Sequence, residues 1–416
     1  MARDGNAKGM KETKFKDTVL GKIPEEWSVA QVGDLFSMKR NNTLSRDNLN
    51  YSDLAGYKNI HYGDVLVKFG AFIDISTDTL PFVNHDIKFN PDLLENGDVI
   101  IADTAEDETV GKASEVIGIS AKDKVVSGLH TMILHPNEKF ASKYLGYFLN
   151  GEAYHNSLYN SMQGTKVISI SKKAINATSI AYPSLSEQQR IASALSDVDA
   201  LVAELDALIE KKRAIMAGTM QELLTGKRRL QGFSGERKET SLSYFGNVTM
   251  GQSPSSLFYN DAKDGLPLIQ GNADMCNRKS IIRNYTSKIT KTCNAGDIIM
   301  SVRAPVGAVG IASFDSCIGR GVCAFKRNNF LYYLLLFIED DWSKLSAGST
   351  FESVNGNHIR NFEVTIPSSL AEQRAIASIL SDMDAEIAEL EAKRDKYKEV
   401  RQGMMQQLLT GKIRLI

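Results

Sequence analysis

The sequence predicts an α+β protein in which two similar globular α/β domains are separated by two long helices that pair as an antiparallel coiled coil. The strongest evidence is an internal repeat: residues 185–230 and 370–415 align without a gap, and 26 of the 46 positions are identical. Apolar residues recur in steps of three and four along both copies, which is typical of a helix with one apolar face. Fainter repeats precede each copy, so we expect the order domain, long helix, domain, long helix.

Length and composition define the broad class. A chain of 416 residues, 43% hydrophobic and 24% charged, is globular and long enough for several domains. Its longest apolar run, residues 330–338, is too short to cross a bilayer, and the N-terminus lacks the apolar core of a secretion signal. The four cysteines have no CxxC spacing, which argues against a disulfide framework or a zinc site. We therefore expect a cytoplasmic protein without a membrane partner.

Each long helix carries its own start and stop signals. Ser184 and Ser369 stand at the N-caps, and Glu187 and Glu372 follow three residues later. This spacing predicts a capping box, in which the hydroxyl accepts from the first turn and the carboxylate bonds back to the cap. The LLTGK sequence that closes both copies predicts the helix ends, because glycine favours the position after a helix and a cation suits its C-terminus.

An apolar seam along the two helices is expected to form their interface. The residues assigned to it are Leu195, Val198, Val202, Leu205, Ile209, Leu380, Met383, Ile387 and Leu390. A lone helix with such a seam could equally pack on its own domain, but two copies of equal length favour packing on each other. A second apolar edge of the first helix is expected to receive a helix of a partner chain; it comprises Leu201, Leu208, Ile215 and Leu224.

The segments between the helices predict a shared strand framework. β-branched and aromatic runs predict strands at residues 65–69, 98–103, 297–302 and 323–327. Gly97-Asp98 in the first domain matches Gly296-Asp297 in the second. Further along, we pair Ser127-Gly128 with Arg320-Gly321, and Gly164-Thr165 with Gly348-Ser349.

The net charge of −1 is unevenly distributed. Residues 185–224 and 370–409 together carry −5, which leaves +4 for the rest of the chain. A modestly basic pair of domains on an acidic helical spacer is compatible with nucleic-acid contact, although many ordinary enzymes share this charge balance.

The motifs of catalysis are missing from the sequence. The Gly-Lys pairs at 226–227 and 411–412 lack the first glycine of a phosphate-binding loop. Residues 90–93 (NPDL) do not complete an adenine methyltransferase motif, and no Glu-x-Lys follows them at the spacing of a metal-dependent nuclease. The six histidines are scattered. We therefore expect a protein that is not an enzyme and that needs no cofactor or metal.

Several of these motifs resemble those of one family. The tandem LxEQ…IAxxLSDxDA…LLTGK helices, the opening residues 20–27 (LGKIPEEW) and residues 296–307 (GDIIMSVRAPVG) are similar to sequences in the specificity subunits of type I restriction-modification systems. The resemblance covers the chain from residue 18 onward. It implies a non-catalytic DNA-binding subunit with two target recognition domains, each contacting one half of a bipartite, asymmetric sequence.

The resemblance also implies partners. In this family the paired helices set the spacer between the half-sites and bind two methyltransferase subunits, and restriction subunits with translocase and nuclease activity join the complex. Double-stranded DNA and these subunits are therefore the expected partners. The alternative is a coiled-coil scaffold that binds proteins without DNA specificity.

Domain boundaries follow from the repeat and the resemblance. We expect a mobile N-terminal extension at 1–17, target recognition domains at 18–183 and 229–367, and long helices at 184–228 and 368–416. Because the rise per helical residue is constant, the helix pair is expected to act as a ruler. An insertion after Thr225 is predicted to widen the gap between half-sites and to leave each half-sequence unchanged.

Candidates for DNA contact are loop residues with paired donors and acceptors or with cationic side chains. In the first domain they are Lys39, Arg40, Asn41, Asn42, Lys58, Asn59, His61, Gln163, Thr165 and Lys166. In the second domain they are Gln252, Ser253, Ser255, Gln270, Asn272, Arg303, Arg320 and Thr350. Arg303 is also a candidate to pair with Asp297.

Overall fold

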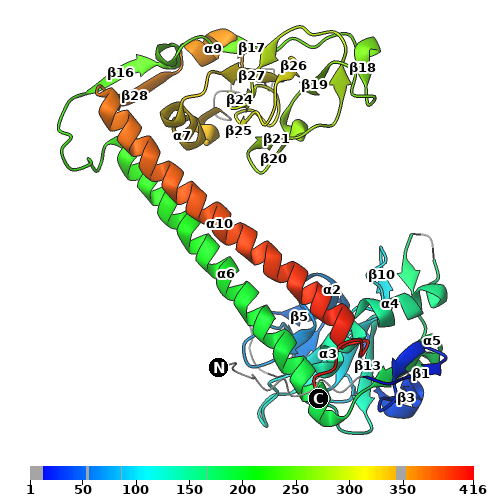
Figure 1. Ribbon diagram of the computed structural model, residues 1–416. Coiled ribbons are helices and arrows are strands. Elements are labelled where there is room, and N and C mark those ends of the chain that lie inside the picture. Colours follow the sequence, from blue (N-terminus) through cyan, green and yellow to red (C-terminus); the bar gives the residue numbers. More distant parts are fainter. Residues whose placement is uncertain (1–12, 53–55, 86, 165, 343–352) are drawn as a thin grey trace, which may run out of the picture. The chain divides into compact units, whose positions relative to one another are not determined.

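The computed structural model describes residues 13–52, 56–85, 87–164, 166–342 and 353–416 (Figure 1). The chain divides into two compact units. Unit 1 contains the described residues up to Glu204 together with Arg394–Ile416, and unit 2 contains Leu205–Lys393. Each unit therefore holds one α/β domain, part of the first long helix and part of the second.

The domain of unit 1 is built on a main sheet with strand order β4-β13-β9-β11-β7 and a second sheet with order β12-β6-β8-β5. Shorter ladders join β1 to β2, β3 to β15 and β10 to β14. The strands are β1 Phe15–Thr18, β2 Gly21–Pro24, β3 Ser28–Gln31, β4 Phe36–Lys39, β5 Leu49–Asn50, β6 Lys58–Ile60, β7 Phe72–Asp74, β8 Phe82–Val83, β9 Val99–Ala102, β10 Thr104–Ala105, β11 Ala113–Ile117, β12 Val125–Ser127, β13 Thr131–Pro136, β14 Ile168–Ser169 and β15 Ser179–Tyr182. The helices are α1 Val32–Leu35, α2 Tyr62–Val67, α3 Tyr144–Leu149, α4 Glu152–Leu158 and α5 Lys172–Ala177.

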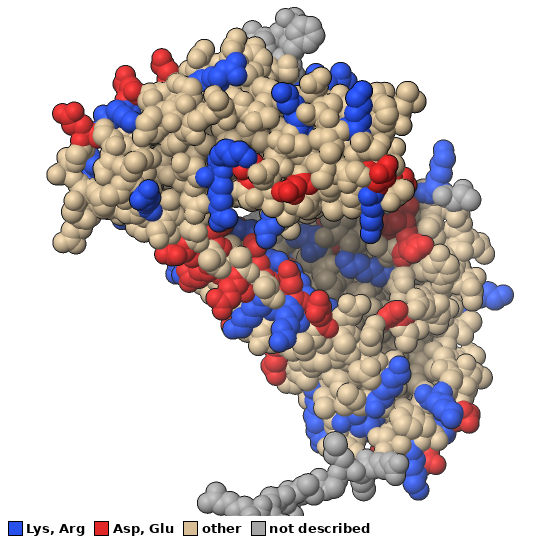
Figure 2. All heavy atoms as spheres, turned by 45° about the horizontal axis from the view of Figure 1, so that its top comes forward, with Lys and Arg blue, Asp and Glu red and all other residues tan. Residues whose placement is uncertain are grey.

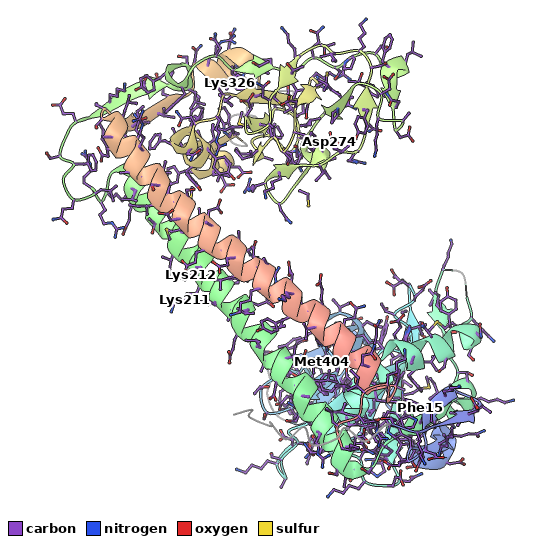
Figure 3. All side chains as sticks on the ribbon, viewed as in Figure 1. Phe15, Lys211, Lys212, Asp274, Lys326 and Met404 are labelled. Atoms are coloured by element: carbon purple, nitrogen blue, oxygen red, sulfur yellow. The ribbon has the colours of Figure 1, made fainter. Side chains whose placement is uncertain are left out.

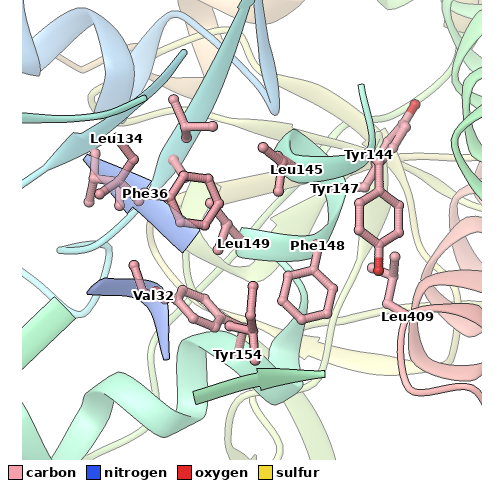
Figure 4. Close-up of a cluster of buried hydrophobic side chains, with 14 of the residues drawn as sticks. Val32, Phe36, Leu134, Tyr144, Leu145, Tyr147, Phe148, Leu149, Tyr154 and Leu409 are labelled. Carbon is pink, nitrogen blue, oxygen red and sulfur yellow. The ribbon is translucent and has the colours of Figure 1, made fainter. Parts of the chain in front are cut away.

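The core of unit 1 joins its main sheet to both long helices. Strand β9 is buried along its whole length, as a continuous apolar run predicts for a central strand. Figure 4 shows side chains of β4 and β13 packed near those of α3, with Leu409 approaching α3 from the end of the second long helix. Burial of a large apolar side chain contributes about 1.5–3 kcal/mol, so this cluster holds the helix ends firmly on the domain.

One predicted strand of unit 1 is wrong. Residues 65–69 were expected to be extended, but Val65 and Val67 belong to helix α2. Val65 is fully buried and Val67 is 89% exposed. Residues two apart share a face in a strand and diverge in a helix, so only the helix separates these two environments. The side chain of His61 caps the helix by accepting a hydrogen bond from the Gly63 N–H at 3.1 Å.

The domain of unit 2 repeats this plan. Its main sheet has the order β17-β27-β24-β25-β21-β20, and its second sheet has the order β18-β22-β19-β26-β23. The strands are β16 Arg237–Ser241, β17 Thr249–Met250, β18 Tyr259–Asn260, β19 Leu266–Ile269, β20 Met275–Cys276, β21 Lys279–Ser280, β22 Tyr285–Thr286, β23 Thr292–Cys293, β24 Ile298–Ser301, β25 Val309–Ile311, β26 Ser316–Ile318, β27 Val322–Phe325 and β28 Glu363–Pro367. The helices are α7 Asn329–Phe337 and α9 Gly356–Arg360, and β16 pairs with β28.

Strand register corrects one of the sequence matches between the domains. In the parallel pairs, Ser127 of β12 lies opposite Ile60 of β6, and Ile318 of β26 lies opposite Ile269 of β19. Ser127-Gly128 therefore corresponds to Ile318-Gly319 and not to Arg320-Gly321. The loops between β12 and β13 and between β26 and β27 have equal length, so Leu129 corresponds to Arg320. The match of Gly164-Thr165 with Gly348-Ser349 involves residues outside those described.

The two long helices are α6 (Leu185–Thr225) and α10 (Leu370–Leu408). They run antiparallel and pack on each other (Figure 1). In unit 1, Arg401 of α10 pairs with Asp199 of α6. In unit 2, Lys212 of α6 pairs with Glu386 of α10 at 2.6 Å, and Arg213 pairs with Glu391. Lys212 is labelled on α6 in Figure 3.

The predicted capping boxes are half correct. Ser184 Oγ and Ser369 Oγ each accept the backbone N–H three residues on, at 3.4 Å. The carboxylate of Glu187 does not return to the cap, however, because it accepts two hydrogen bonds from Arg414 at 2.6 and 2.7 Å. Its repeat equivalent Glu372 likewise binds Arg229 at 2.7 and 2.8 Å. The start of each helix is thus joined to the segment that follows the other helix.

The seam residues divide between two environments. Leu195 and Leu380 are fully buried in the domain cores of units 1 and 2, so the first turns of each helix face their own domain. Leu205, Ile209 and Ile387 are buried but belong to neither domain core. The remaining seam residues are partly buried: Val198, Val202, Met383 and Leu390.

The repeated LSDxDA motif fastens each domain to its helix. The Tyr147 hydroxyl of α3 donates to Asp199 Oδ2 at 2.7 Å and lies 3.2 Å from Ser196 Oγ. Burial, together with the Asp199 carboxylate, raises the pKa of Tyr147 well above its usual value. Tyr333 of α7 bonds in the same way to Ser381 and Asp384. The motif that repeats in sequence therefore serves a repeated contact.

Within the described ranges, none of the helices has the length and apolar character needed to span a bilayer. The same residues contain no cluster of three or more His, Cys, Asp and Glu side chains arranged to hold a metal ion. Of the predicted N-terminal extension, residues 1–12 lie outside the described ranges, and Phe15–Thr18 forms strand β1.

Candidate nucleic-acid interface

Three loops meet at the same place in both domains. They leave the carboxyl ends of β4, β6 and β12 in unit 1 and of the equivalent β17, β19 and β26 in unit 2. We call this surface the three-loop edge; it comprises residues 41–43, 61–62 and 128–130 in unit 1 and residues 251–253, 270–272 and 319–321 in unit 2. The loops after β6 and β12, and after β19 and β26, follow neighbouring parallel strands of the second sheet, a common place for ligands to bind. The loop after β4 or β17 comes from the main sheet.

Equivalent backbone hydrogen bonds build both edges. In unit 1 the Asn42 N–H donates to Ser127 O at 2.8 Å, and the Gly128 N–H donates to Ile60 O at 2.9 Å. In unit 2 the Gln252 N–H donates to Ile318 O at 2.9 Å, and the Gly319 N–H donates to Ile269 O at 2.8 Å. The scaffold is therefore the same, and only the side chains on it differ.

Close approach of the loops in unit 2 requires glycine. A Cβ at Gly321 would lie 2.1 Å from the carbonyl oxygen of Gln270, and one at Gly251 would lie 2.1 Å from the carbonyl oxygen of Gly319. Asp274, labelled in Figure 3, holds the middle loop, because its Oδ2 accepts from the Gln270 N–H at 2.7 Å and from the Gly271 N–H at 3.2 Å. The loops are thus fixed by close backbone packing and by the Asp274 carboxylate.

The edge of unit 2 presents unpaired polar side chains. Gln252 and Arg320 are exposed, and Asn272 is half-buried. Among the residues described, none forms a hydrogen bond or ion pair with these three side chains. Gln270 accepts from the Tyr259 hydroxyl at 3.3 Å through its Oε1, and Ser253 Oγ accepts from the Arg320 N–H at 3.0 Å. The structure therefore brings together Gln252, Ser253, Gln270, Asn272 and Arg320, as a contact surface requires.

At the edge of unit 1, the candidate amide side chains already have hydrogen-bond partners within the domain. Asn41 donates to the Gly128 and Thr131 carbonyl oxygens at 3.1 and 3.0 Å. Asn42 is buried and donates to Asn59 Oδ1 at 2.8 Å, and Asn59 is itself fully buried. These three amides hold the loops in place, so they are not available to a ligand in this arrangement.

His61 of the same edge is also engaged within the domain, because its ring caps helix α2. Its Nδ1 accepts the Gly63 N–H, and burial, followed by the charge of Arg46, lowers its pKa below the usual value of 6.5. The His61 ring is tilted by 38° against the ring of Tyr62, with centroids 4.7 Å apart, and Tyr62 in turn meets His130 edge-on with centroids 5.3 Å apart. His130 was not among the sequence candidates, because it lies in no recognisable motif and strand register alone brings it to the edge.

The predicted cations of unit 1 have acidic partners. Lys39 binds Asp98 at 2.9 Å and Glu95 at 2.7 Å, and Asp98 is completely buried. Arg40 forms a bidentate hydrogen-bonded ion pair with Asp92, which lowers the pKa of the Asp92 carboxyl.

Lys58, the third of these cations, binds Asp123 at 2.8 Å, and this bond, with those from Ser120, lowers the Asp123 pKa to about 2. Each of the three cations is thus neutralised within its own domain.

The remaining candidates lie away from the edges or outside the described ranges. Gln163 pairs its backbone with Ser169, and Lys166 is exposed three residues further on. Arg303 is exposed and does not pair with Asp297, whose partner is Lys326 at 2.9 Å. Ser255 is exposed beside the edge of unit 2. Thr165 and Thr350 lie outside the described residues.

Charge is mixed over the visible surface. On the face drawn in Figure 2, Lys and Arg side chains are interspersed with Asp and Glu among uncharged residues. Affinity for a polyanion therefore rests on local placement of a few cations, since the net charge of the chain is −1.

Comparisons with known proteins all relate the chain to type I restriction-modification specificity proteins. The family profile of the type I restriction modification DNA specificity domain matches residues 24–212 and 236–399. The chain is 30% identical over 431 aligned residues to a Methanocaldococcus jannaschii protein assigned as the type I restriction enzyme MjaX specificity subunit, covering 97% of this chain and 98% of that protein.

Solved structures show the same fold. A chain from a structure of type I restriction-modification complex assembly superimposes with a TM-score of 0.61 at 23% identity, covering 94% of this chain and 100% of the other. The type I restriction-modification S subunit from M. genitalium superimposes with a TM-score of 0.58 at 15% identity, covering 92% and 96%.

Proposed function

The chain belongs to the type I restriction-modification DNA specificity family, and from this premise we propose that each of its two domains binds one half of a bipartite, asymmetric DNA target. As a member of that family it is the DNA specificity subunit, a non-catalytic component of the type I restriction-modification enzyme. The modification and restriction activities then reside on other chains of the complex.

The observation that carries the proposal is one scaffold with two sets of side chains. Backbone contacts at the three-loop edge are equivalent in the two domains, whereas the side chains at equivalent positions differ, as with Asn42 and Gln252 or His61 and Gln270. A shared scaffold lets both domains approach DNA in the same way, and unlike side chains give unlike base preferences. An asymmetric target is the expected consequence.

The paired helices suit the role of a spacer. An α-helix has a fixed rise of about 1.5 Å per residue, and cross-helix ion pairs fix the register of α6 and α10 within each unit. An insertion after Thr225 is a poor test of this role, because Leu223 and Leu224 are already fixed in the core of unit 2. Such an insertion would lengthen only the connection to β16.

A better test lengthens both helices together. Seven residues are inserted into α6 between Asp199 and Lys212, and seven into α10 between Glu391 and Arg401, which keeps both sets of ion pairs. Two helical turns add about 10 Å, which corresponds to about three base pairs of DNA. We expect the preferred gap to grow by this amount while both half-sequences stay the same. An unchanged gap would contradict the ruler.

We further propose that the exposed side of α6 binds methyltransferase subunits. Leu208 and Ile215 are 38% and 47% exposed, one heptad apart on the same helix face. Apolar side chains in that arrangement fit an amphipathic helix of a partner. Charged replacements at both positions should abolish co-purification with the methyltransferase subunit and leave the fold unchanged. Restriction subunits would join the complex through those subunits or this chain.

The direct test of function is selection of DNA by the assembled complex. The chain, co-expressed with its methyltransferase subunits, is incubated with a duplex library that contains a long randomised region, and bound molecules are sequenced at moderate salt. We expect two short conserved blocks separated by a constant gap. Binding without sequence preference, or no binding at all, would favour the protein scaffold instead.

A further inference from the structure

Arg320 holds a distinctive position on the edge of unit 2. It is the middle residue of Gly319-Arg320-Gly321, the loop that joins β26 to β27. Its backbone N–H donates to Ser253 Oγ at 3.0 Å, and the Val322 N–H closes the turn on the Gly319 carbonyl at 3.0 Å. The base of the side chain is therefore fixed, which lowers the entropy lost when the guanidinium binds a ligand.

The guanidinium group itself is uncommitted. Arg320 is exposed, and no acidic or carbonyl partner binds its side chain among the residues described. Two other arginines of unit 2 are engaged, since Arg278 binds Glu339 at 2.7 Å and Arg229 binds Glu372. A cation left free in the middle of a rigid loop is available for a ligand.

The neighbours of Arg320 favour a base over a phosphate as that ligand. The side chains of Gln252, Gln270 and Asn272 stand on the adjoining loops, and amides offer a donor and an acceptor side by side. Paired donors and acceptors match base edges in the major groove, whereas a phosphate needs donors alone. Among such side chains, arginine is the one whose two parallel N–H groups match O6 and N7 of guanine.

We propose that Arg320 selects a guanine in the half-site bound by unit 2. The proposal rests on the DNA-binding function above and adds the identity of one base and the residue that reads it. At the equivalent position unit 1 carries Leu129, which cannot donate hydrogen bonds. The half-site of unit 1 therefore lacks this guanine contact, which adds to the asymmetry of the target.

The test compares substitutions at Arg320 in the complete complex with its methyltransferase subunits. Arg320→Leu introduces the residue of unit 1, and Arg320→Lys keeps the charge but removes the planar pair of donors. The matched control is Arg327→Leu, since Arg327 is an exposed arginine at the other end of β27. Each complex selects bound sequences from the randomised duplex library, and competition against single-base variants gives the preference at each position.

We expect Arg320→Leu to lose preference at one position of one half-site, a position where the unaltered protein requires guanine. The loss should be about 10- to 100-fold, the discrimination that a bidentate arginine contact supplies. Arg320→Lys should keep most of the affinity with a reduced preference for guanine, and Arg327→Leu should keep both half-sequences.

Two results would overturn the assignment. If Arg320→Leu weakens binding equally for all sequences, Arg320 contacts a phosphate; if the lost preference is for another base, the pairing with guanine is wrong. Thermal unfolding of each variant shows that unit 2 remains folded. Failure of the proposed function is distinct, because in that case the unaltered complex selects no bipartite sequence.

Discussion

The contact between Glu187 and Arg414 offers a sharp test of how the helix ends are held. Glu187 stands in the first turn of α6, and Arg414 follows the end of α10. The side chains are 2% and 8% exposed, and two hydrogen bonds of 2.6 and 2.7 Å join them. The bond therefore ties together two segments that are 227 residues apart in the chain.

Replacing Glu187 by Gln keeps its shape and removes its charge. Arg414 would then remain buried without an opposite charge at this contact, and removal of one partner of a buried ion pair costs about 3 to 5 kcal/mol. The amide still accepts one hydrogen bond, and Arg414 also contacts Glu26 at 3.1 Å, so we expect about 3 kcal/mol. At usual denaturant slopes this lowers the urea midpoint of unit 1 by about 1 M or more.

The two tryptophans allow each unit to be followed separately. Trp27 is 1% exposed in unit 1, and Trp342 is fully buried in unit 2. Fluorescence of a Trp342→Phe protein reports unfolding of unit 1 alone, and Trp27→Phe reports unit 2. Separate reporters are needed because a chain of several units does not unfold in a single two-state step.

The control for this experiment is Glu204→Gln, an exposed glutamate on the same helix. It should leave the Trp27 transition unchanged. The reasoning fails if Glu187→Gln unfolds at the midpoint of the unaltered protein. It also fails if the Trp342 transition falls as far as the Trp27 transition, since the contact belongs to unit 1.

Three further outcomes are expected. Burial, opposed in part by the N–H groups of Lys143 and Gly146, raises the pKa of Glu115 from 4.5 to about 7. Between these two pH values the Glu115 carboxyl is protonated in the folded protein and ionised in the unfolded chain. The stability of unit 1 should therefore fall by up to about 3 kcal/mol as the pH rises from 4.5 to 7 in Trp27-monitored urea unfolding, and Glu115→Gln should flatten this slope. Lys39→Met, which leaves the buried Asp98 without its cation, should cost unit 1 about 1–3 kcal/mol in the same assay, whereas DNA affinity per folded molecule stays constant; a lower affinity would show that Lys39 contacts DNA. Asp274→Ala releases the loop at Gln270 and should lower base discrimination several-fold in the half-site of unit 2 alone when DNA selection is repeated; an equal loss in both half-sites would contradict this role.

Sequence reasoning was most successful where the signal is local. The long helices, their serine caps and their repetition follow from residues that are neighbours in the chain, since a helix repeats every 3.6 residues and its caps act within one turn. The strands at residues 98–103 and 297–302 were predicted for the same reason, because a wholly buried strand is a continuous apolar run. The run at residues 65–69 is also rich in apolar and β-branched residues, and only its packing places residues 65–67 in a helix.

The tertiary structure decided the roles of the polar side chains. Nothing near Lys39 or Arg40 in sequence identifies Asp98 and Asp92 as their partners, because these carboxylates are more than 50 residues away and strand pairing brings them close. The partner of the Glu187 carboxylate was also decided by the tertiary structure. The capping-box pattern assigns this carboxylate to the N-cap of its own helix, but Arg414, 227 residues away, binds it instead with two charge-assisted hydrogen bonds.

The sequence by itself therefore determined the order of domains and helices, their duplication and the family. Only the tertiary structure decided which loops form an edge, that Leu129 stands where unit 2 has Arg320, and which polar groups remain free to bind. The physical reason is range. Secondary structure depends on the spacing of nearby residues, whereas a binding surface depends on which distant residues the strand register places side by side.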